Sequence, residues 1–191
     1  MIKEKNTEYF LVDILMGTFN GLKFIDDQIK SLQAQTHKNW ILYVRDDGST
    51  DNTIQHIKTK WASDSRIRLT EDDKGRLGFN GNFFSLLELS TSRYVMFCDQ
   101  DDFWCKNKIK LTLESMVSYE SGSPNCPIMV HCDSLVCDSS LNSLGARFVG
   151  ARARARAPAP CRSASSRSAV GDAGMRPGRT RHIRPGWADC R

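Results

Sequence analysis

Short apolar runs alternate with amphipathic segments along the first two thirds of the chain. Runs of four to eight apolar residues that end in polar or turn residues predict buried strands. Such runs lie at residues 10–16, 40–44, 66–70 and 94–98. Each is followed by apolar residues at helical spacing, which predict helices carrying residues 22–32, 54–61, 80–89 and 109–117.

Several details of these elements can also be predicted. Asp51 or Thr50 is expected to cap the second helix. The third helix is expected to bury Phe83, Leu86 and Leu87. Two more short strands are predicted at residues 128–132 and 135–137.

The alternation of strand and helix predicts an α/β fold, with a mostly parallel sheet covered by helices on both faces. Sheets of this kind bind ligands in the crevice at the carboxyl ends of their strands. Polar clusters follow all four strands: GTFN, DDGSTDNT, the segment from Gly75 to Asn82, and DQDD. One such cluster is typical of an ordinary turn, but four that open onto the same edge predict a binding site.

Asp99, Asp101 and Asp102 directly follow the apolar run YVMFC. Residues two apart on an extended chain share a face, so Asp99 and Asp101 are expected to point the same way. Converging carboxylates repel each other unless a cation lies between them, and Mg²⁺ or Mn²⁺ bridges carboxylates to phosphates. Asp101 or Asp102 could instead cap the following helix. Because a cap needs only one acid, the pattern favours binding of a metal and a diphosphate.

The net charge of +5 is divided unevenly along the chain. Residues 1–146 sum to −4, whereas residues 147–191 contain 11 Arg and 2 Asp and sum to +9. A segment rich in Arg, Ala, Pro, Gly and Ser cannot bury a core and is expected to be disordered. We therefore predict an N-terminal extension at residues 1–9, a folded α/β domain at 10–145 and a disordered tail at 146–191.

The abrupt change in composition near Gly145 indicates a frameshift or a chimeric junction. An Arg-rich tail that binds nucleic acid or an anionic membrane is the functional alternative. The tail lacks interleaved aromatic residues and an amphipathic period, so no nucleic-acid partner is expected.

Nothing in the apolar pattern indicates a membrane span. No apolar run approaches the roughly 18 residues that a span needs, and the first eight residues lack the apolar segment of a signal peptide. We expect a cytoplasmic protein, either free or bound peripherally at the inner face of the plasma membrane.

The ordered motifs over residues 10–145 resemble those of family 2 glycosyltransferases with the GT-A fold. The stretch DQDDFWCKNKI is most similar to the acidic motif of bacterial rhamnosyltransferase-type members. The resemblance implies transfer of a sugar, with inversion, from a dTDP- or UDP-linked donor and with help from Mg²⁺ or Mn²⁺. It also implies a saccharide or lipid-linked saccharide acceptor in surface polysaccharide assembly. The leading expectation for the donor is dTDP-rhamnose.

The resemblance further implies roles for individual residues. The loop that packs on the nucleobase and ribose matches Gly17, Thr18 and Phe19. Asp46, with its neighbour Asp47, matches the acid that hydrogen-bonds the base. Gly78 and Asn82 match a segment that lines the diphosphate. The match to the acidic motif implies that Asp101 binds the metal and that Asp99 binds the ribose or the metal.

Each of these residues also has an ordinary structural interpretation. Phe19 could equally be a core residue, and Asn82 could cap or decorate the third helix. Asp46 and Asp47 could simply shape a turn.

The catalytic base of the family lies downstream of the acidic motif, where the Arg-rich tail stands in this chain. No residue can be assigned to that role, and we expect a truncated chain that binds donor without transferring sugar. Two alternatives stay open: a non-catalytic nucleotide-sugar-binding fragment, and a sugar-nucleotide pyrophosphorylase. The latter carries Arg and Lys in a Gly-rich loop after its first strand, and GTFNG lacks both.

Overall fold

The computed structural model describes residues 7–122, 127–138 and 141–148. The chain divides into two compact units, Met1–Glu114 and Ser115–Arg191, where the sequence predicted one domain over residues 10–145. The elements follow in the order β1 (Val12–Thr18), α1 (Ile25–Gln33), β2 (Trp40–Asp46), α2 (Thr53–Lys60), β3 (Ile67–Thr70), α3 (Gly78–Leu87), β4 (Tyr94–Asp99), α4 (Lys108–Gly122), β5 (Ser134–Cys137) and β6 (Ser143–Phe148).

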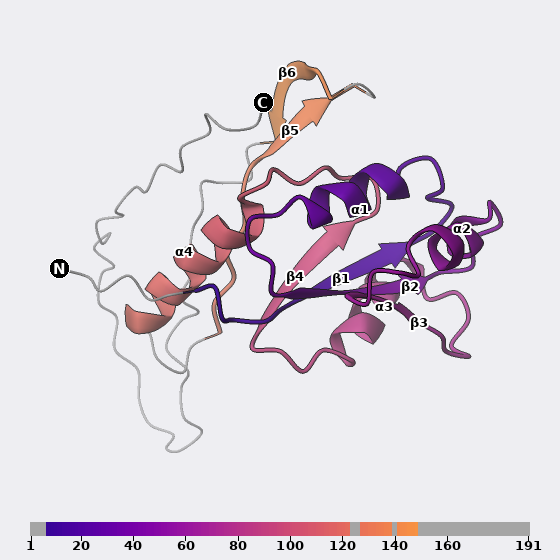
Figure 1. Cartoon of the computed structure of the whole chain (residues 1–191), viewed down its shortest axis with the longest axis horizontal. Coiled ribbons are helices and arrows are strands. Elements are labelled where there is room, and N and C mark those ends of the chain that lie inside the picture. Colours follow the sequence, from indigo (N-terminus) through magenta and orange to yellow (C-terminus); the bar gives the residue numbers. More distant parts are fainter. Residues whose placement is uncertain (1–6, 123–126, 139–140, 149–191) are drawn as a thin grey trace, which may run out of the picture. The chain divides into compact units, whose positions relative to one another are not determined.

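The first unit is built on a parallel sheet of four strands in the order β3-β2-β1-β4 (Figure 1). The register places Thr18 of β1 opposite Asp46 of β2, and Gly17 of β1 opposite Asp99 of β4. The ends of these three strands therefore form one edge, which we call the carboxyl edge. The α/β fold with a mostly parallel sheet is confirmed.

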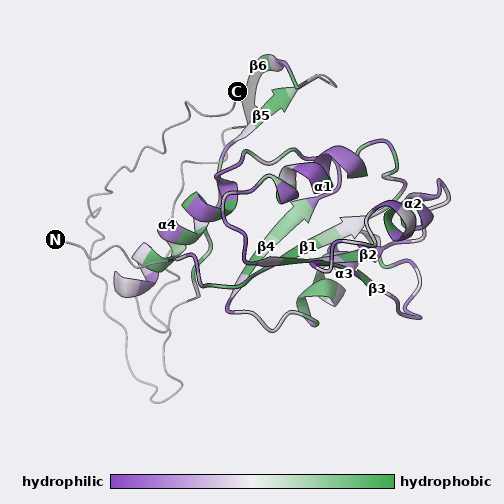
Figure 2. Cartoon of the chain, viewed as in Figure 1, coloured by the Kyte–Doolittle hydropathy of each residue, from purple (hydrophilic) through white to green (hydrophobic). Residues whose placement is uncertain are grey.

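Helices cover both faces of this sheet, with α1 and α3 on opposite sides (Figure 1). Burial is deepest in β1, where every residue from Val12 to Met16 is buried. Figure 2 shows β4 as largely hydrophobic and α1 as largely hydrophilic. An apolar central layer with amphipathic covering helices is the arrangement that parallel sheets require, because they are buried on both faces.

The beginning of α2 differs from the prediction. The N-cap residue is Asn52, which is left-handed with φ 64° and makes no side-chain cap hydrogen bond. The backbone N–H of Thr53 donates instead to the carboxylate of Asp51, 3.2 Å away. Asp51, one residue before the N-cap, thus accepts a hydrogen bond from an N–H of the first turn. Thr50 is not the cap.

The buried face of α3 also differs from the prediction. The helix buries Asn82, Ser85 and Leu86, while Leu87 is 40% exposed and Phe83 is half-buried. The apolar residues of α3 were expected to face the sheet, but two polar side chains occupy that face.

The second unit contains an antiparallel pair of strands, β5 and β6, with an irregular register between Leu135 and Cys137. The strand predicted at residues 135–137 is confirmed, whereas residues 128–132 form no strand. The strand β6 was not predicted, and its residues 146–148 belong to the segment expected to be disordered. Residues 149–191 lie outside the described residues, so disorder of the remaining tail stays a prediction. In the part of the chain that the structure describes, no helix is long and apolar enough to cross a membrane.

A buried polar network fixes the segment that follows β4. The side-chain amide of Gln35 donates to the carbonyl oxygens of Ser31 and Cys105, at 3.1 and 2.9 Å, and accepts from the N–H of Ile109 at 3.1 Å. The hydroxyl of Ser31 accepts from the N–H of Trp104 at 3.0 Å. Because Gln35 and Ser31 are buried, this network holds residues 104–109 against α1 and so limits where the preceding acidic turn can lie.

Replacing Gln35 by Leu should leave the buried N–H of Ile109 without its partner. It should also remove one of the hydrogen bonds that the Cys105 carbonyl accepts, while the bond from the N–H of Lys108 remains. Since each unsatisfied buried group is costly, we expect the free energy of unfolding to fall by about 1–3 kcal/mol. Urea unfolding followed by tryptophan fluorescence measures this change. The matched control is Gln55→Leu on the exposed surface of α2, which should change stability by less than about 0.5 kcal/mol. Equal effects of the two substitutions would contradict the role assigned to Gln35.

Candidate functional site

Two loops at the carboxyl edge are joined by hydrogen bonds between side chains and backbone. The N–H of Asn20 donates to the Ser49 hydroxyl at 2.8 Å, and the Asn20 side chain accepts from the N–H of Thr50 at 2.8 Å. The N–H of Leu22 donates to the carboxylate of Asp51 at 3.0 Å. The loop after β1 and the loop after β2 are therefore held together as one surface.

Asp46 lies at the end of β2 and organises the turn that follows it. One carboxylate oxygen accepts from the hydroxyls of Thr18 and Ser49, at 2.9 and 2.5 Å. The other accepts from the N–H groups of Gly48 and Ser49, at 3.1 and 2.7 Å. Four accepted hydrogen bonds are about the capacity of a carboxylate. These contacts fit the turn-shaping interpretation, and recognition of a base by Asp46 stays a prediction.

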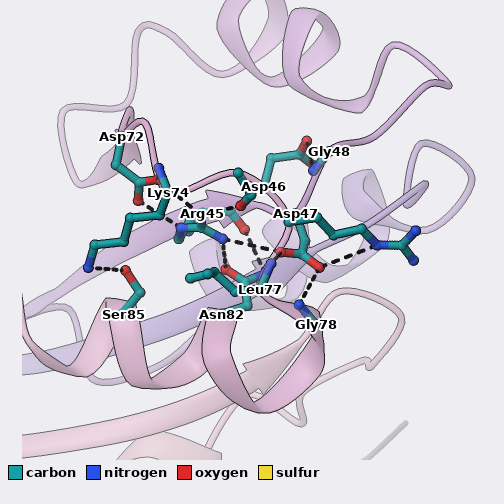
Figure 3. Close-up of polar contacts among 12 residues, drawn as sticks. Arg45, Asp46, Asp47, Gly48, Asp72, Lys74, Leu77, Gly78, Asn82 and Ser85 are labelled. Atoms are coloured by element: carbon teal, nitrogen blue, oxygen red, sulfur yellow. Dashed lines mark hydrogen bonds and ion pairs between the residues drawn. The ribbon is translucent and has the colours of Figure 1, made fainter.

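Arg45, which the sequence reasoning missed, is the centre of a buried polar network (Figure 3). Its side chain is only 3% exposed. The guanidinium binds the Asp72 carboxylate through two hydrogen bonds of 2.7 and 3.0 Å and donates to the Gly75 carbonyl at 2.8 Å. Its remaining nitrogen donates to Asp47 at 3.3 Å and to Asn82 at 3.1 Å. Arg45 thus joins the end of β2 to the loop after β3 and to α3.

Asp47 is buried and binds the beginning of α3. Its carboxylate accepts from the N–H groups of Leu77 and Gly78, at 2.6 and 2.9 Å. The first N–H groups of a helix have no partner within the helix, and a carboxylate there is also favoured by the helix dipole. Gly78 has φ +71°, a conformation that favours glycine. Asp47 therefore supplies to α3 the cap that its own N-terminus lacks.

Asn82 explains why the inward face of α3 is polar. Its side-chain amide accepts from Arg45 and donates back to the Arg45 carbonyl at 3.2 Å. A Cβ atom on Gly17 would come within 2.8 Å of the Asn82 nitrogen. Close packing against Asn82 thus requires glycine at position 17. Asn82 itself holds the side chain and the backbone carbonyl of Arg45. The assignments of Gly17, Gly78 and Asn82 to a nucleotide stay predictions, since their contacts here are internal.

Phe19 lies on the surface of the site. The ring is 37% exposed, so the core interpretation does not hold. The guanidinium of Arg76 lies 4.2 Å from the ring centroid, within the range of a cation–π contact. Arg76 also lines a hollow of about 330 Å³ whose other lining residues are Arg45, Asp46, Gly48, Ile54, Lys58, Leu69, Thr70, Glu71, Asp72 and Gly75.

The acidic turn after β4 carries an excess of negative charge, which the positive charge of Lys108 offsets only in part at Asp99. The strand ends at Asp99 and the chain turns at Gln100 and Asp101, so the alternation of an extended strand does not extend to Asp101. Within the described residues, the carboxylates of Asp99, Asp101 and Asp102 make no hydrogen bond and no ion pair. Burial raises the pKa of Asp99, and the charges of Asp102 and Asp101 raise it further.

The capping interpretation of this turn is wrong. The helix α4 begins at Lys108, six residues beyond Asp102, so neither Asp101 nor Asp102 can accept from its first N–H groups. All three acids therefore remain available for another role.

The acidic turn suits a metal ion that is shared with a ligand. The described residues contain no group of three His, Cys, Asp or Glu side chains arranged to hold a metal. Mg²⁺ is usually bound in nucleotide sites by one or two carboxylates together with phosphate oxygens and water. Asp99 and Asp101, which raise each other's energy when both are charged, fit that partial set of ligands.

An aromatic hollow of about 390 Å³ lies beside Asp99. It is lined by Phe79, Asn80, Phe83, Phe84, Phe97 and Asp99. Phe79, Phe84 and Phe97 are between 55% and 70% exposed. Exposed apolar patches of this kind mark surfaces that bind another molecule or another segment of protein.

The chain belongs to a known family. The family described as "Glycosyl transferase family 2" matches residues 13–136. This membership confirms the resemblance drawn from the motifs and leaves the pyrophosphorylase alternative without support.

The chain matches only part of the length of its curated relatives. A UDP-Glc:alpha-D-GlcNAc-diphosphoundecaprenol beta-1,3-glucosyltransferase of Escherichia coli, WfgD, is 36% identical over 108 residues, which are 56% of this chain and 42% of that protein. The dTDP-rhamnosyl transferase RfbG of Shigella flexneri is 33% identical over 108 residues, 53% of this chain and 37% of that protein. The chain therefore spans about two fifths of the length of these relatives.

A solved structure supports the fold. The mannosyltransferase PcManGT of Pyrobaculum calidifontis, in complex with GDP-Man and Mn²⁺, covers 66% of this chain and 35% of its own chain. The TM-score is 0.51 and the sequence identity is 21%. At this identity the likeness shows the fold alone.

Replacing Asp72 by Asn tests the ion pair that holds the Arg45 network. The hydrogen bonds from Arg45 lower the pKa of Asp72 from 3.8 to about 2. Because the pKa is depressed in the folded state, the stabilisation is complete above the ordinary pKa and is lost as the pH falls toward the folded value. We expect Asp72→Asn to lower the free energy of unfolding at neutral pH by about 1–2 kcal/mol, allowing for partial exposure.

The pH dependence separates this effect from a loss of packing. The difference between wild type and Asp72→Asn should shrink as the pH falls from about 4 to about 2, as measured by urea unfolding at each pH. The matched control, Asp27→Asn, removes an exposed carboxylate paired with Lys30 on α1 and should have little effect at any pH. A difference between wild type and Asp72→Asn that is the same at every pH would show that the charge of Asp72 is not what matters.

Proposed function

We propose that this domain binds a nucleoside-diphosphate sugar together with Mg²⁺ or Mn²⁺, and that the protein transfers the sugar to a saccharide or lipid-linked saccharide. The observation that carries the proposal is the excess of negative charge in the acidic turn of Asp99 and Asp101 on the carboxyl edge. It lies beside the loop of Gly17–Phe19, because β1 and β4 are neighbouring strands. Family membership supports the reaction class.

The proposed roles follow the position of each group on this edge. Phe19 offers an exposed ring for a nucleobase, next to the turn that Asp46 organises. Asp101 would hold the metal, and Asp99 the ribose or the metal. Bound there, the ion would offset the charge that grows on the departing diphosphate.

The donor is proposed to carry a pyrimidine base. A carboxylate acceptor such as Asp46 suits the N–H of uracil or thymine, although Asp46 would then have to exchange one of its present donors. The names of the relatives support both pyrimidine nucleotides, since one is a UDP-Glc enzyme and another a dTDP-rhamnosyl transferase. We retain dTDP-rhamnose as the leading donor, on the strength of the DQDD motif.

The acceptor and location are proposed from the same relatives. Two Escherichia coli relatives are named for a diphosphoundecaprenol-linked substrate. A lipid-linked acceptor would place the protein at the inner face of the plasma membrane, bound peripherally. The role would be surface polysaccharide assembly.

Replacing Asp101 by Asn should remove most of the metal-dependent affinity for the nucleotide. Asn keeps the shape of the side chain but removes the negative charge that attracts a divalent ion. Isothermal calorimetry of UDP, dTDP and GDP, each with Mn²⁺ and with EDTA, measures the effect. We expect UDP or dTDP to bind at least tenfold more tightly with Mn²⁺ in the wild type, and this enhancement to fall below about threefold in the variant.

The exposed Asp27→Asn on α1 is the control and should retain the full enhancement. If Asp101→Asn binds UDP and dTDP as tightly as the wild type in Mn²⁺, the metal assignment is wrong. A wild type that binds none of the three nucleotides would contradict the donor proposal itself.

A further inference from the structure

Gln100 lies in sequence between the two acids that are proposed to hold the metal. Its side chain is hydrogen-bonded to the loop after β1. The Gln100 carboxamide accepts from the N–H of Phe19 at 3.0 Å and donates to the carbonyl of Phe19 at 3.0 Å. An amide that makes both bonds to one residue fixes the position of that residue relative to the acidic turn, as a neighbouring strand would.

Gly21 is shaped to admit this side chain. A Cβ atom on Gly21 would overlap the Gln100 carboxamide and lie 2.6 Å from its Cδ. The N–H of Gly21 donates to the Thr53 hydroxyl at 2.9 Å, so the glycine is held in place from its other side. Gly21 and Gln100 thus form a matched pair although they are distant in sequence.

The loop that Gln100 grips is itself joined to the loop after β2. Asn20 and Leu22 are tied to the segment of Ser49–Asp51, as described above. Ser49 in turn binds Asp46. A displacement of the acidic turn would therefore be passed through Gln100 to Phe19, and from there to the surface proposed for the base.

We infer that Gln100 couples metal binding at the acidic turn to nucleoside binding on the Phe19 loop. The inference rests on the proposed function. Gln100 acts here as a positioning residue, because it touches the loop and the acidic turn and no reacting atom is assigned to it. An ion that orders Asp99 and Asp101 would also order the residue between them, and through it Phe19. A nucleotide that packs on Phe19 would strengthen metal binding by the same factor, because such coupling is reciprocal.

The test is a cycle of affinities measured on the full 191-residue chain. The dissociation constant of UDP or dTDP is measured by calorimetry with Mg²⁺ and with EDTA, for the wild type, Gln100→Ala, Gly21→Ala and the double variant. The ratio of the two constants is the metal enhancement. Loss of the two hydrogen bonds should reduce this enhancement by roughly fivefold in Gln100→Ala, while the direct contact between metal and diphosphate persists.

Gly21→Ala should reduce the enhancement to a similar degree, because the new methyl group displaces the carboxamide without touching an acid. The double variant should match Gln100→Ala alone, since the clash disappears when the carboxamide is absent. A purely structural role would lower affinity equally with Mg²⁺ and with EDTA and would leave the enhancement unchanged.

Nuclear magnetic resonance gives a readout that needs no nucleotide. Adding Mg²⁺ alone should shift the backbone amide signal of Phe19 in the wild type. The same addition should leave that signal unmoved in Gln100→Ala, although signals from the acidic turn still respond.

The outcomes separate this inference from the proposal on which it rests. An undiminished metal enhancement in Gln100→Ala, with a Phe19 signal that still responds to Mg²⁺, would overturn the coupling and leave the proposed function standing. No metal enhancement in the wild type would overturn both.

Discussion

The candidate site depends on one buried charge, the guanidinium of Arg45. A buried cation is stable only if its hydrogen bonds are met and its charge is balanced. Arg45 meets this condition with the carboxylates of Asp72 and Asp47, the amide of Asn82 and the carbonyl of Gly75. These partners come from three places in the chain, so the loop after β3 and the start of α3 are fixed to the end of β2.

The sheet and its functional edge could be predicted because they follow from local patterns. Four short apolar runs separated by amphipathic segments allow few arrangements other than a parallel sheet. In such a sheet the segments after β1, β2 and β4 must open onto one edge, which is why Thr18, Asp46 and Asp99 meet there. The family motifs predicted a role for each residue, but they did not predict which residues it contacts.

The partnerships at this edge could not be predicted, because they join residues that are far apart in sequence. No local pattern in the sequence links Arg45 to Asn82, because the two residues are 37 positions apart. The buried face of the third helix was predicted wrongly for a related reason. Its aromatic residues indicated an apolar buried face, whereas Asn82 and Ser85 are the buried side chains together with Leu86. The inward polar face exists to complete the Arg45 network, to which Lys74 adds a bond to the Ser85 hydroxyl at 2.9 Å (Figure 3).

The acids of the carboxyl edge consequently fall into two groups that a count of charges does not distinguish. Asp46, Asp47 and Asp72 are satisfied by the protein itself, through backbone N–H groups, hydroxyls and Arg45. Asp99 and Asp101 have no such partners in the described residues, and burial, together with the charges of Asp102 and Asp101, raises the pKa of Asp99. A positive ligand added to this edge would therefore lower its energy most at the acidic turn, where the charge is unbalanced. The Arg45 network contributes by keeping Asp47 and Asp72 from competing for that ligand.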